Sequence, residues 1–131
     1  MIRGLAHVCY TVRDIEKSVD FYQNQLGLGH AFDFINAEGK RHGVYLKAGQ
    51  RSFIELFEGA HDDRSDKQSY RHICLEVDDI EVTVAELRSR GIEVGPITLG
   101  GDRSWQAWLE DPDGNRIELH CYTPESKQLN C

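Results

Sequence analysis

The pattern of apolar and polar positions near the start of the chain recurs in its second half. The segment 7–22 reads HVCYTVRDIEKSVDFY, and the segment 72–87 reads HICLEVDDIEVTVAEL. Further along, the triplet IEL occurs at 54–56 and again at 117–119. Self-similarity at a nearly fixed spacing is typical of a duplicated module. The sequence therefore predicts two copies of one structural unit.

The repeat also gives the boundaries of the modules. We place module one at 1–58 and module two at 70–122, within a single domain that spans all 131 residues. A polar linker at 59–69 (GAHDDRSDKQS) joins them. The polar tail at 123–131 lies outside the repeat, and we assign it no function. We expect it to fray, with packing across a dimer as the alternative.

Within each module the spacing of apolar residues changes from that of a strand to that of a helix. An apolar-rich strand at 5–12 or 71–77 comes first, and Asp14 or Asp79 then stands where a helix N-cap belongs. Residues at helical spacing follow in each module: Ile15, Val19, Tyr22 and Leu26, then Ile80, Val84 and Leu87. Gly27 and Gly91 would end these helices.

Three short strands separated by turn residues complete each module. They are predicted at 30–36, 41–48 and 51–58, and at 93–98, 103–110 and 116–122. Each module is therefore βαβββ, and the fold class is α+β. A single such unit leaves its sheet half covered, so we expect the two modules to curl their mixed sheets into a cupped, barrel-like surface.

Composition and charge exclude several classes of function. The net charge of −7 argues against nucleic acid and against anionic lipid, because both partners require a basic surface. No apolar run is long enough to span a membrane, and the start of the chain does not resemble a signal peptide. The four cysteines lack C-x-x-C spacing, and without a secretory signal this favours reduced thiols in a cytoplasmic protein. The partner that we expect is a small-molecule substrate.

Two kinds of metal-binding side chain recur at matched positions of the repeat. His7 aligns with His72 on the first strand, and Glu55 aligns with Glu118 on the last strand. Two imidazoles and two carboxylates would neutralise one divalent ion. This donor set suits Ni, Co or Zn, with Mn and Fe(II) as further candidates. Taken singly, each His could be a packed side chain and each Glu could face solvent, but recurrence in both modules favours one metal site.

The remaining histidines and thiols lack this symmetry. His30, His42 and His61 have no partner in the repeat, and we expect them near turns or on the surface. His120 shares the strand face of Glu118, so it could support that ligand; we favour an exposed position at the rim. Cys9 and Cys74 follow the ligand histidines by two residues and would line the cup.

These residues resemble those of the vicinal oxygen chelate superfamily, and within it those of glyoxalase I. The resemblance covers 5–122 and is carried by HVCYTV, DIEKSVDFYQNQLGL, FIELF, RHICLEV and EDPDGNRIEL. It implies a bound divalent metal and, for members of this size, a homodimer, often with each site at the subunit interface. The complete set of two His and two Glu resembles glyoxalase I more closely than relatives that use two His and one Glu, carry Gln at position 55 or lack the ligands.

The resemblance implies the chemistry of a lactoylglutathione lyase. The hemithioacetal of an α-ketoaldehyde such as methylglyoxal would pass through a metal-stabilised enediolate to a 2-hydroxy thioester. Glu118 would act as the principal base, and Glu55 would serve the opposite face of the substrate. The positions that hold glutathione in similar members carry Arg and Asn, whereas this chain has Thr11 and Gly59 there. The thiol could therefore be a different one, or the substrate another molecule with two adjacent oxygens.

Other side chains could contact the substrate. Tyr45 and Trp108 occupy matched positions on the strand beside the ligand-bearing strand, and they would lie opposite Glu55 and Glu118 if the connecting turns have odd lengths. Packing within the sheet is the alternative for both. A carboxylate on the substrate could bind Arg103, Arg51 or Lys47, although basic residues on strands are commonly solvated.

Two other functions compete with a glyoxalase-type lyase. The first is an Fe(II) extradiol-type dioxygenase, against which four protein ligands argue, because they leave too few positions for a catechol and O2. The second is a protein that sequesters a small molecule, as in drug resistance, without turnover. Retention of all four candidate ligands argues against that function, since sequestering needs no metal.

Overall fold

The computed structural model describes residues 5–60 and 72–131 of the chain. These residues form two compact units, which we call unit one and unit two and which correspond in order to the two modules. Most of the predicted linker, together with His61 and the expected first residue of the strand at 71–77, lies outside the described residues.

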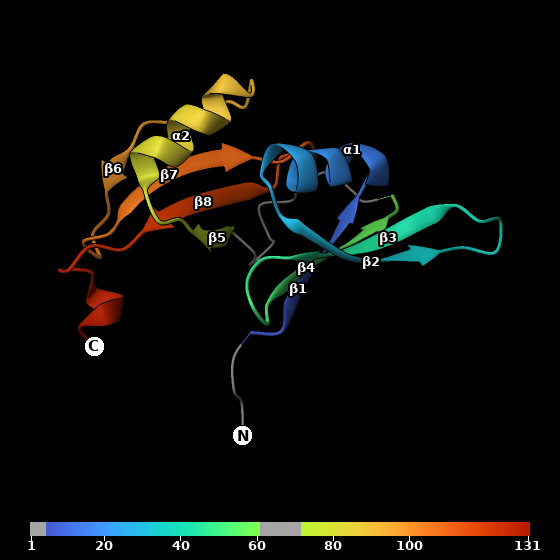
Figure 1. Cartoon of the computed structure of the whole chain (residues 1–131), viewed down its shortest axis with the longest axis horizontal. Helices are drawn as coiled ribbons and strands as arrows, with labels where there is room; N and C mark the ends of the chain where they lie inside the picture. Colours follow the sequence, from blue (N-terminus) through green and yellow to red (C-terminus); the bar gives the residue numbers. More distant parts are fainter. Residues whose placement is uncertain (1–4, 61–71) are drawn as a thin grey trace. The chain divides into compact units, whose positions relative to one another are not determined.

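Unit one consists of a four-stranded sheet with helical turns on one face (Figure 1). Its strands lie in the order β1-β4-β3-β2, with β1 parallel to β4 and the other pairs antiparallel. The elements are β1 (His7–Val12), α1 (Ile15–Val19), η1 (Asp20–Gln25), β2 (Gly29–Ile35), β3 (Arg41–Lys47) and β4 (Phe53–Glu58).

Unit two repeats this topology, with the strand order β5-β8-β7-β6 and β5 parallel to β8. Its elements are β5 (Ile73–Glu76), α2 (Ile80–Ser89), β6 (Thr98–Leu99), β7 (Trp105–Glu110), β8 (Arg116–Cys121) and η2 (Lys127–Leu129). The two four-stranded mixed sheets confirm the predicted α+β class and the βαβββ order; the cup remains a prediction. Across 5–60 and 72–131, we find no helix with the length and apolar character needed to cross a membrane.

Both predicted helix starts are confirmed. The side chain of Asp14 accepts a hydrogen bond of 3.0 Å from the backbone N–H of Lys17, and Asp79 does the same for Val82. Each aspartate therefore satisfies a first-turn amide that would otherwise lack a partner.

The first helix differs from the regular helix that the sequence predicts. After α1 the chain continues as the π-helix η1, in which the Leu26 N–H bonds to the Phe21 carbonyl at 2.9 Å. The wider turn rotates the buried face, so Phe21 and Tyr22 are buried while Leu26 is half-buried.

Buried and more exposed residues alternate along the strands, so each sheet has one face in the core and one face that is open. In β4, Ile54 and Leu56 are buried beneath α1, whereas Phe53, Glu55 and Phe57 lie on the opposite side. Unit two follows the same rule, with Ile117 and Leu119 of β8 in the core on the side of α2. The candidate ligands therefore share the sheet face away from the helix in each unit.

The strand predicted at 93–98 is wrong except at Thr98, because the observed strand β6 has only two residues, Thr98 and Leu99. Pro96 lacks the N–H that a strand would donate, and the Arg88 guanidinium bonds to the carbonyls of Val94 and Gly95 at 2.8 Å. The next strand begins at Trp105 because the preceding residues form a tight turn in which Arg103 has a φ of 68°.

The tail is held in place, so the expected fraying is wrong. The Lys127 N–H donates to the Asp102 carbonyl at 2.8 Å, and the Thr123 hydroxyl donates to the Arg103 carbonyl at 2.7 Å. The buried hydroxyls of Ser104 and Ser126 also bond to each other at 2.8 Å. The tail thus packs on the turn between β6 and β7 of its own unit, through contacts that its polar composition alone does not predict.

Candidate metal centre

In unit one, the parallel pairing of β1 and β4 brings the first His–Glu pair together. Cys9 lies opposite Glu55 in this register, and His7 points to the same face two residues earlier. The Nε2 atom of His7 is 3.6 Å from Oε2 of Glu55. The His7 side chain is 43% exposed and that of Glu55 only 14%, so the carboxylate is the more enclosed member of the pair.

Unit two forms the second pair by the same arrangement. Cys74 lies opposite Glu118, and His72 directly precedes β5 rather than lying within it as expected. Its Nε2 atom is 3.2 Å from Oε2 of Glu118. The Glu118 side chain is 11% exposed, and the His72 side chain is 36% exposed.

The spacing of these donor atoms fits a bound divalent ion. Two ligand atoms bound to one metal at about 2.1 Å lie about 3.0–3.4 Å apart in octahedral or tetrahedral geometry. The separations of 3.6 Å and 3.2 Å are close to this range. Each pair also offers one imidazole nitrogen and one carboxylate oxygen, so each unit supplies half of the predicted donor set.

An aromatic side chain flanks each pair, because the condition of odd turn length is met in both units. Tyr45 lies opposite Glu55, and Trp108 lies opposite Glu118, because both connecting segments have five residues. The Tyr45 hydroxyl is 3.4 Å from Nδ1 of His7. The Trp108 ring packs edge-on against His72, with a centroid distance of 4.8 Å. Both rings therefore lie on the ligand-bearing face.

The DPDG sequence fixes the register of β8. The Asp111 carboxylate accepts hydrogen bonds from the backbone N–H groups of Asp113 at 2.9 Å and of Asn115 at 2.7 Å. Gly114 has a φ of 74°, a conformation that glycine adopts without strain. The turn brings Glu118 opposite Trp108 and thereby gives the motif its role in the site.

Two thiols lie beside the carboxylates. Burial raises the pKa of Cys9 to about 11, with a further contribution from its hydrogen bond to Glu55. Burial likewise raises the pKa of Cys74 to about 11, and the nearby charge of Glu118 adds to this effect. Atoms of Cys74, Glu118 and His120 lie within 4.8 Å of one another. Both thiols lie on the ligand-bearing face, where the repeat predicts that they line the site.

His120 is buried, so the expectation of an exposed rim position is wrong. It is only 5% exposed, and its Nδ1–H donates to Oε1 of Glu118 at 3.1 Å. The alternation of strand residues already placed it on the face of Glu118. The proximity of Asp102, with Oδ2 3.8 Å from Nε2 of His120, had no signal in the sequence.

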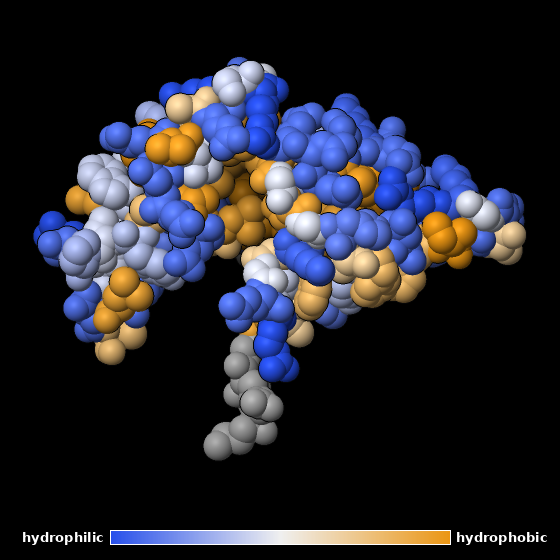
Figure 2. Space-filling view, in the orientation of Figure 1, coloured by the Kyte–Doolittle hydropathy of each residue, from blue (hydrophilic) through white to orange (hydrophobic). Residues whose placement is uncertain are grey.

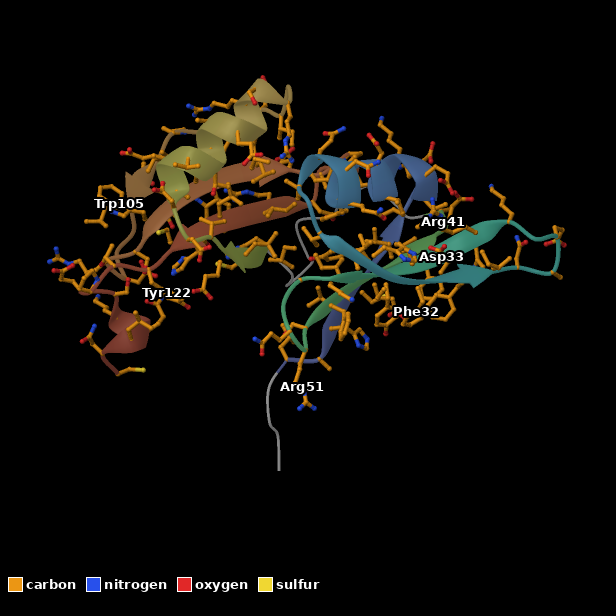
Figure 3. All side chains as sticks on the ribbon, in the orientation of Figure 1. Phe32, Asp33, Arg41, Arg51, Trp105 and Tyr122 are labelled. Atoms are coloured by element: carbon orange, nitrogen blue, oxygen red, sulfur yellow. The ribbon has the colours of Figure 1, made fainter. Side chains whose placement is uncertain are left out.

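Of the residues proposed to contact the substrate, Thr11 lies on the ligand-bearing face and Arg103 lies in a turn outside the strands. Thr11 is exposed and shares the face of His7, and a Cβ atom at Gly59 would lie 3.1 Å from its methyl group. The two positions that depart from the glutathione-binding pattern are therefore neighbours. Arg103 is exposed at the turn before β7, and Arg51 points away from the strands in the loop between β3 and β4 (Figure 3).

Unit one also carries an aromatic cluster that sequence reasoning missed. Phe32 is 48% exposed and stacks on Tyr45, with a centroid distance of 4.7 Å and an interplanar angle of 13°. Phe34 packs against Phe57 at 4.9 Å. Figure 3 shows Phe32 on one side of β2, with Asp33 and Arg41 towards α1, and Figure 2 shows apolar surface on the side away from the helix. Phe32 and Phe34 are two residues apart on a predicted strand, and this spacing indicates that their rings share one face of the sheet.

Comparisons with known proteins agree with this geometry. Residues 4–119 match the Glyoxalase/Bleomycin resistance protein/Dioxygenase superfamily. A protein named lactoylglutathione lyase from Neisseria meningitidis serogroup A is 31% identical over 123 residues, which cover 88% of each chain.

Two solved structures are also similar. The structure of SMU.1112c has a TM-score of 0.80 and 27% identity, and covers 92% of this chain and 99% of its own. TnmS3, described as an antibiotic binding protein from Streptomyces sp. CB03234, has a TM-score of 0.73 and 27% identity, and covers 93% of this chain and 98% of its own.

Proposed function

This chain belongs to the Glyoxalase/Bleomycin resistance protein/Dioxygenase superfamily, and we propose that it is a metal-dependent lyase of glyoxalase type. The observation that carries the proposal is the recurrence of one His–Glu pair in each unit, with nitrogen–oxygen separations of 3.6 Å and 3.2 Å. We propose that His7, Glu55, His72 and Glu118 together hold one divalent ion, with Ni, Co or Zn preferred over Mn or Fe.

The proposed substrate is the hemithioacetal of an α-ketoaldehyde and a thiol. When bound, the divalent ion supplies Lewis-acid stabilisation for negative charge on the two adjacent oxygens. Glu118 takes the proton from the carbon that bears sulfur; the C–H electron pair forms a double bond between the two carbons, and the carbonyl π pair moves to its oxygen. A carboxylate then returns the proton to the neighbouring carbon, while the hydroxyl proton on the sulfur-bearing carbon passes to the neighbouring oxygen. The first carbon becomes a carbonyl and the product is a 2-hydroxy thioester. Glu55 serves the opposite face of the substrate.

The thiol in this proposal differs from glutathione. Thr11 and Gly59 adjoin each other, and neither offers the cationic or amide group that would bind a glutamyl carboxylate. Tyr45 and Trp108 flank the His–Glu pairs, and we propose that they contact the substrate. Arg103 could bind a carboxylate only if the substrate reaches the turn before β7.

The first test is metal analysis of the purified protein, followed by activity. Apo-protein would receive Ni, Co, Zn or Mn and then methylglyoxal hemithioacetals of several thiols, with thioester formation followed by absorbance. We expect turnover with at least one pair of metal and thiol. If metal binds but no combination forms a thioester, the glyoxalase assignment is contradicted, while the proposal of a metal site still stands.

The second test replaces the proposed base. Glu118→Gln should lower kcat by about 10²–10⁴-fold, because general-base catalysis contributes that much. His30→Leu is the matched control, since it removes a histidine that pairs with Asp33 at 3.0 Å on β2. Full activity in Glu118→Gln would disprove the catalytic role of this carboxylate.

A protein that sequesters a small molecule is the second candidate function. The aromatic cluster of Phe32, Phe34 and Tyr45 favours it, because an exposed stack of rings can bind a planar molecule. Metal-free protein that binds such a molecule without turnover would support this function. An extradiol dioxygenase is disfavoured by four proposed protein ligands. We also propose a homodimer, which light scattering coupled to size-exclusion chromatography would test.

A further inference from the structure

The two carboxylates of the repeat have different surroundings, although they stand at matched positions. Two residues after Glu55 the chain has Phe57, and two residues after Glu118 it has His120. Phenylalanine has no side-chain hydrogen-bond donor, whereas His120 donates to Glu118 at 3.1 Å. The two matched positions therefore carry the same carboxylate, but the residues two positions later, Phe57 and His120, differ in chemistry.

His120 holds one oxygen of Glu118 and leaves the other free to face its histidine partner. The imidazole contacts Oε1, while Oε2 lies 3.2 Å from Nε2 of His72. The His120 side chain is only 7% exposed, so the hydrogen bond is shielded from water. The carboxylate thus presents Oε2 in one direction.

The second ring nitrogen of His120, Nε2, lies near the carboxylate of Asp102. Nε2 is buried, lacks a hydrogen-bond partner among the described residues, and lies 3.8 Å from Oδ2 of Asp102. The Gln128 amide donates to the same oxygen, and the Ser104 N–H donates to Oδ1 at 3.1 Å. These hydrogen bonds, that of Gln128 foremost, hold the pKa of Asp102 below its usual value. Asp102 is thus an anchored carboxylate facing the imidazole.

We infer that His120 is a positioning residue for Glu118; the Asp102 carboxylate, held by Gln128 of the C-terminal tail, lies 3.8 Å from its second nitrogen. The inference rests on the proposed function, because it concerns Glu118 as a metal ligand. Hydrogen-bonded partners of metal ligands typically change metal affinity by about 10–100-fold when they are removed. Glu118 is accordingly the carboxylate that an imidazole positions, whereas Glu55 accepts a hydrogen bond from the Cys9 thiol.

The test measures Co²⁺ binding by the apo-protein, using the absorption spectrum of the bound ion. His120→Leu should weaken binding by about 10–100-fold without changing the shape of the spectrum, because the ligands themselves stay the same. His120→Asn keeps an N–H at the position of Nδ1 and should restore most of the affinity. Asp102→Asn should give an intermediate loss, and His30→Leu should leave affinity unchanged.

Two outcomes would overturn the inference. His120→Leu with the affinity of the wild type shows that the imidazole does not position Glu118. A changed absorption spectrum shows that His120 is itself a ligand. Absence of Co²⁺ binding by the wild type is a separate outcome, because it removes the proposed metal function together with the inference.

A double-variant comparison separates positioning from general stability. In a Glu118→Gln background, His120→Leu should lower Co²⁺ affinity much less than it does in the wild type, because its effect passes through the carboxylate. An equal loss in both backgrounds would show that His120 acts by another route. Thermal unfolding of each apo-variant checks that the fold is retained.

Discussion

Gly43 lies in the middle of β3, directly opposite Phe57 of β4. The Phe57 ring occupies the space that a side chain at position 43 would need. A Cβ atom there would lie 2.6 Å from two ring carbons and 3.1 Å from the Leu56 carbonyl oxygen. Carbon atoms normally approach to about 3.5 Å. The substitution Gly43→Ala must therefore displace the ring or the strand.

The expected cost follows from two opposing effects. Overpacking of this kind costs about 1–3 kcal/mol, and replacing glycine by alanine within a strand returns about 0.5–1 kcal/mol. Taking the middle of both ranges, Gly43→Ala should lower the free energy of unfolding by about 1 kcal/mol. Each kcal/mol shifts Tm by about 4–8 °C for a cooperative unit of 60–100 residues.

Thermal unfolding followed by circular dichroism measures the shift. The control is Gly49→Ala, where the nearest atom, Cβ of Ser52, lies at an ordinary contact distance of 3.8 Å. We expect no loss of stability in that variant. Phe57→Leu should relieve part of the penalty of Gly43→Ala, so the two changes should not be additive. Equal stability of Gly43→Ala and wild type, or full additivity with Phe57→Leu, would refute the reasoning.

Two further predictions concern polar contacts. Asp79→Ala should lower the free energy of unfolding by about 1 kcal/mol, because it removes the N-cap of α2. Asp14→Ala should cost less, since Glu58 also accepts from the first turn of α1 at 3.0 Å; urea unfolding midpoints measure both, and a larger loss at α1 would contradict this order. The hydrogen bond from His30, together with Arg41, holds the pKa of Asp33 below its usual value. The stability difference between wild type and Asp33→Asn should therefore be present at pH 5 and shrink as pH falls below about 3.9. A difference that persists in strong acid would contradict the assignment.

The repeat made the fold predictable to an unusual degree. Because a strand exposes alternate residues, the matched positions of Glu55 and Glu118 fixed which face of each sheet bears the carboxylate. The observed five-residue segments meet the condition of odd length, so Tyr45 and Trp108 lie opposite these carboxylates. In module one the predicted strands 41–48 and 51–58 had left only two residues between them. Strand boundaries were less accurate where Pro96 and the turn around Arg103 interrupt the pattern.

Contacts between distant side chains were not predictable in the same way. The approach of Asp102 to His120, and of Gln128 to Asp102, depends on how a tight turn and the tail fold against each other. The π-helix that buries Phe21 is a similar case, because its sequence also fits a regular helix. The shared metal site, the homodimer and the cytoplasmic location stay predictions.

The His–Glu pair of each unit is formed entirely within that unit, with the histidine in β1 or directly before β5 and the glutamate in the parallel neighbouring strand. Copying one such module therefore copies a complete pair of donors, and the set is doubled without any further residue. The matched positions Phe57 and His120 differ in chemistry, so the two donor pairs share one backbone arrangement and have different neighbouring side chains.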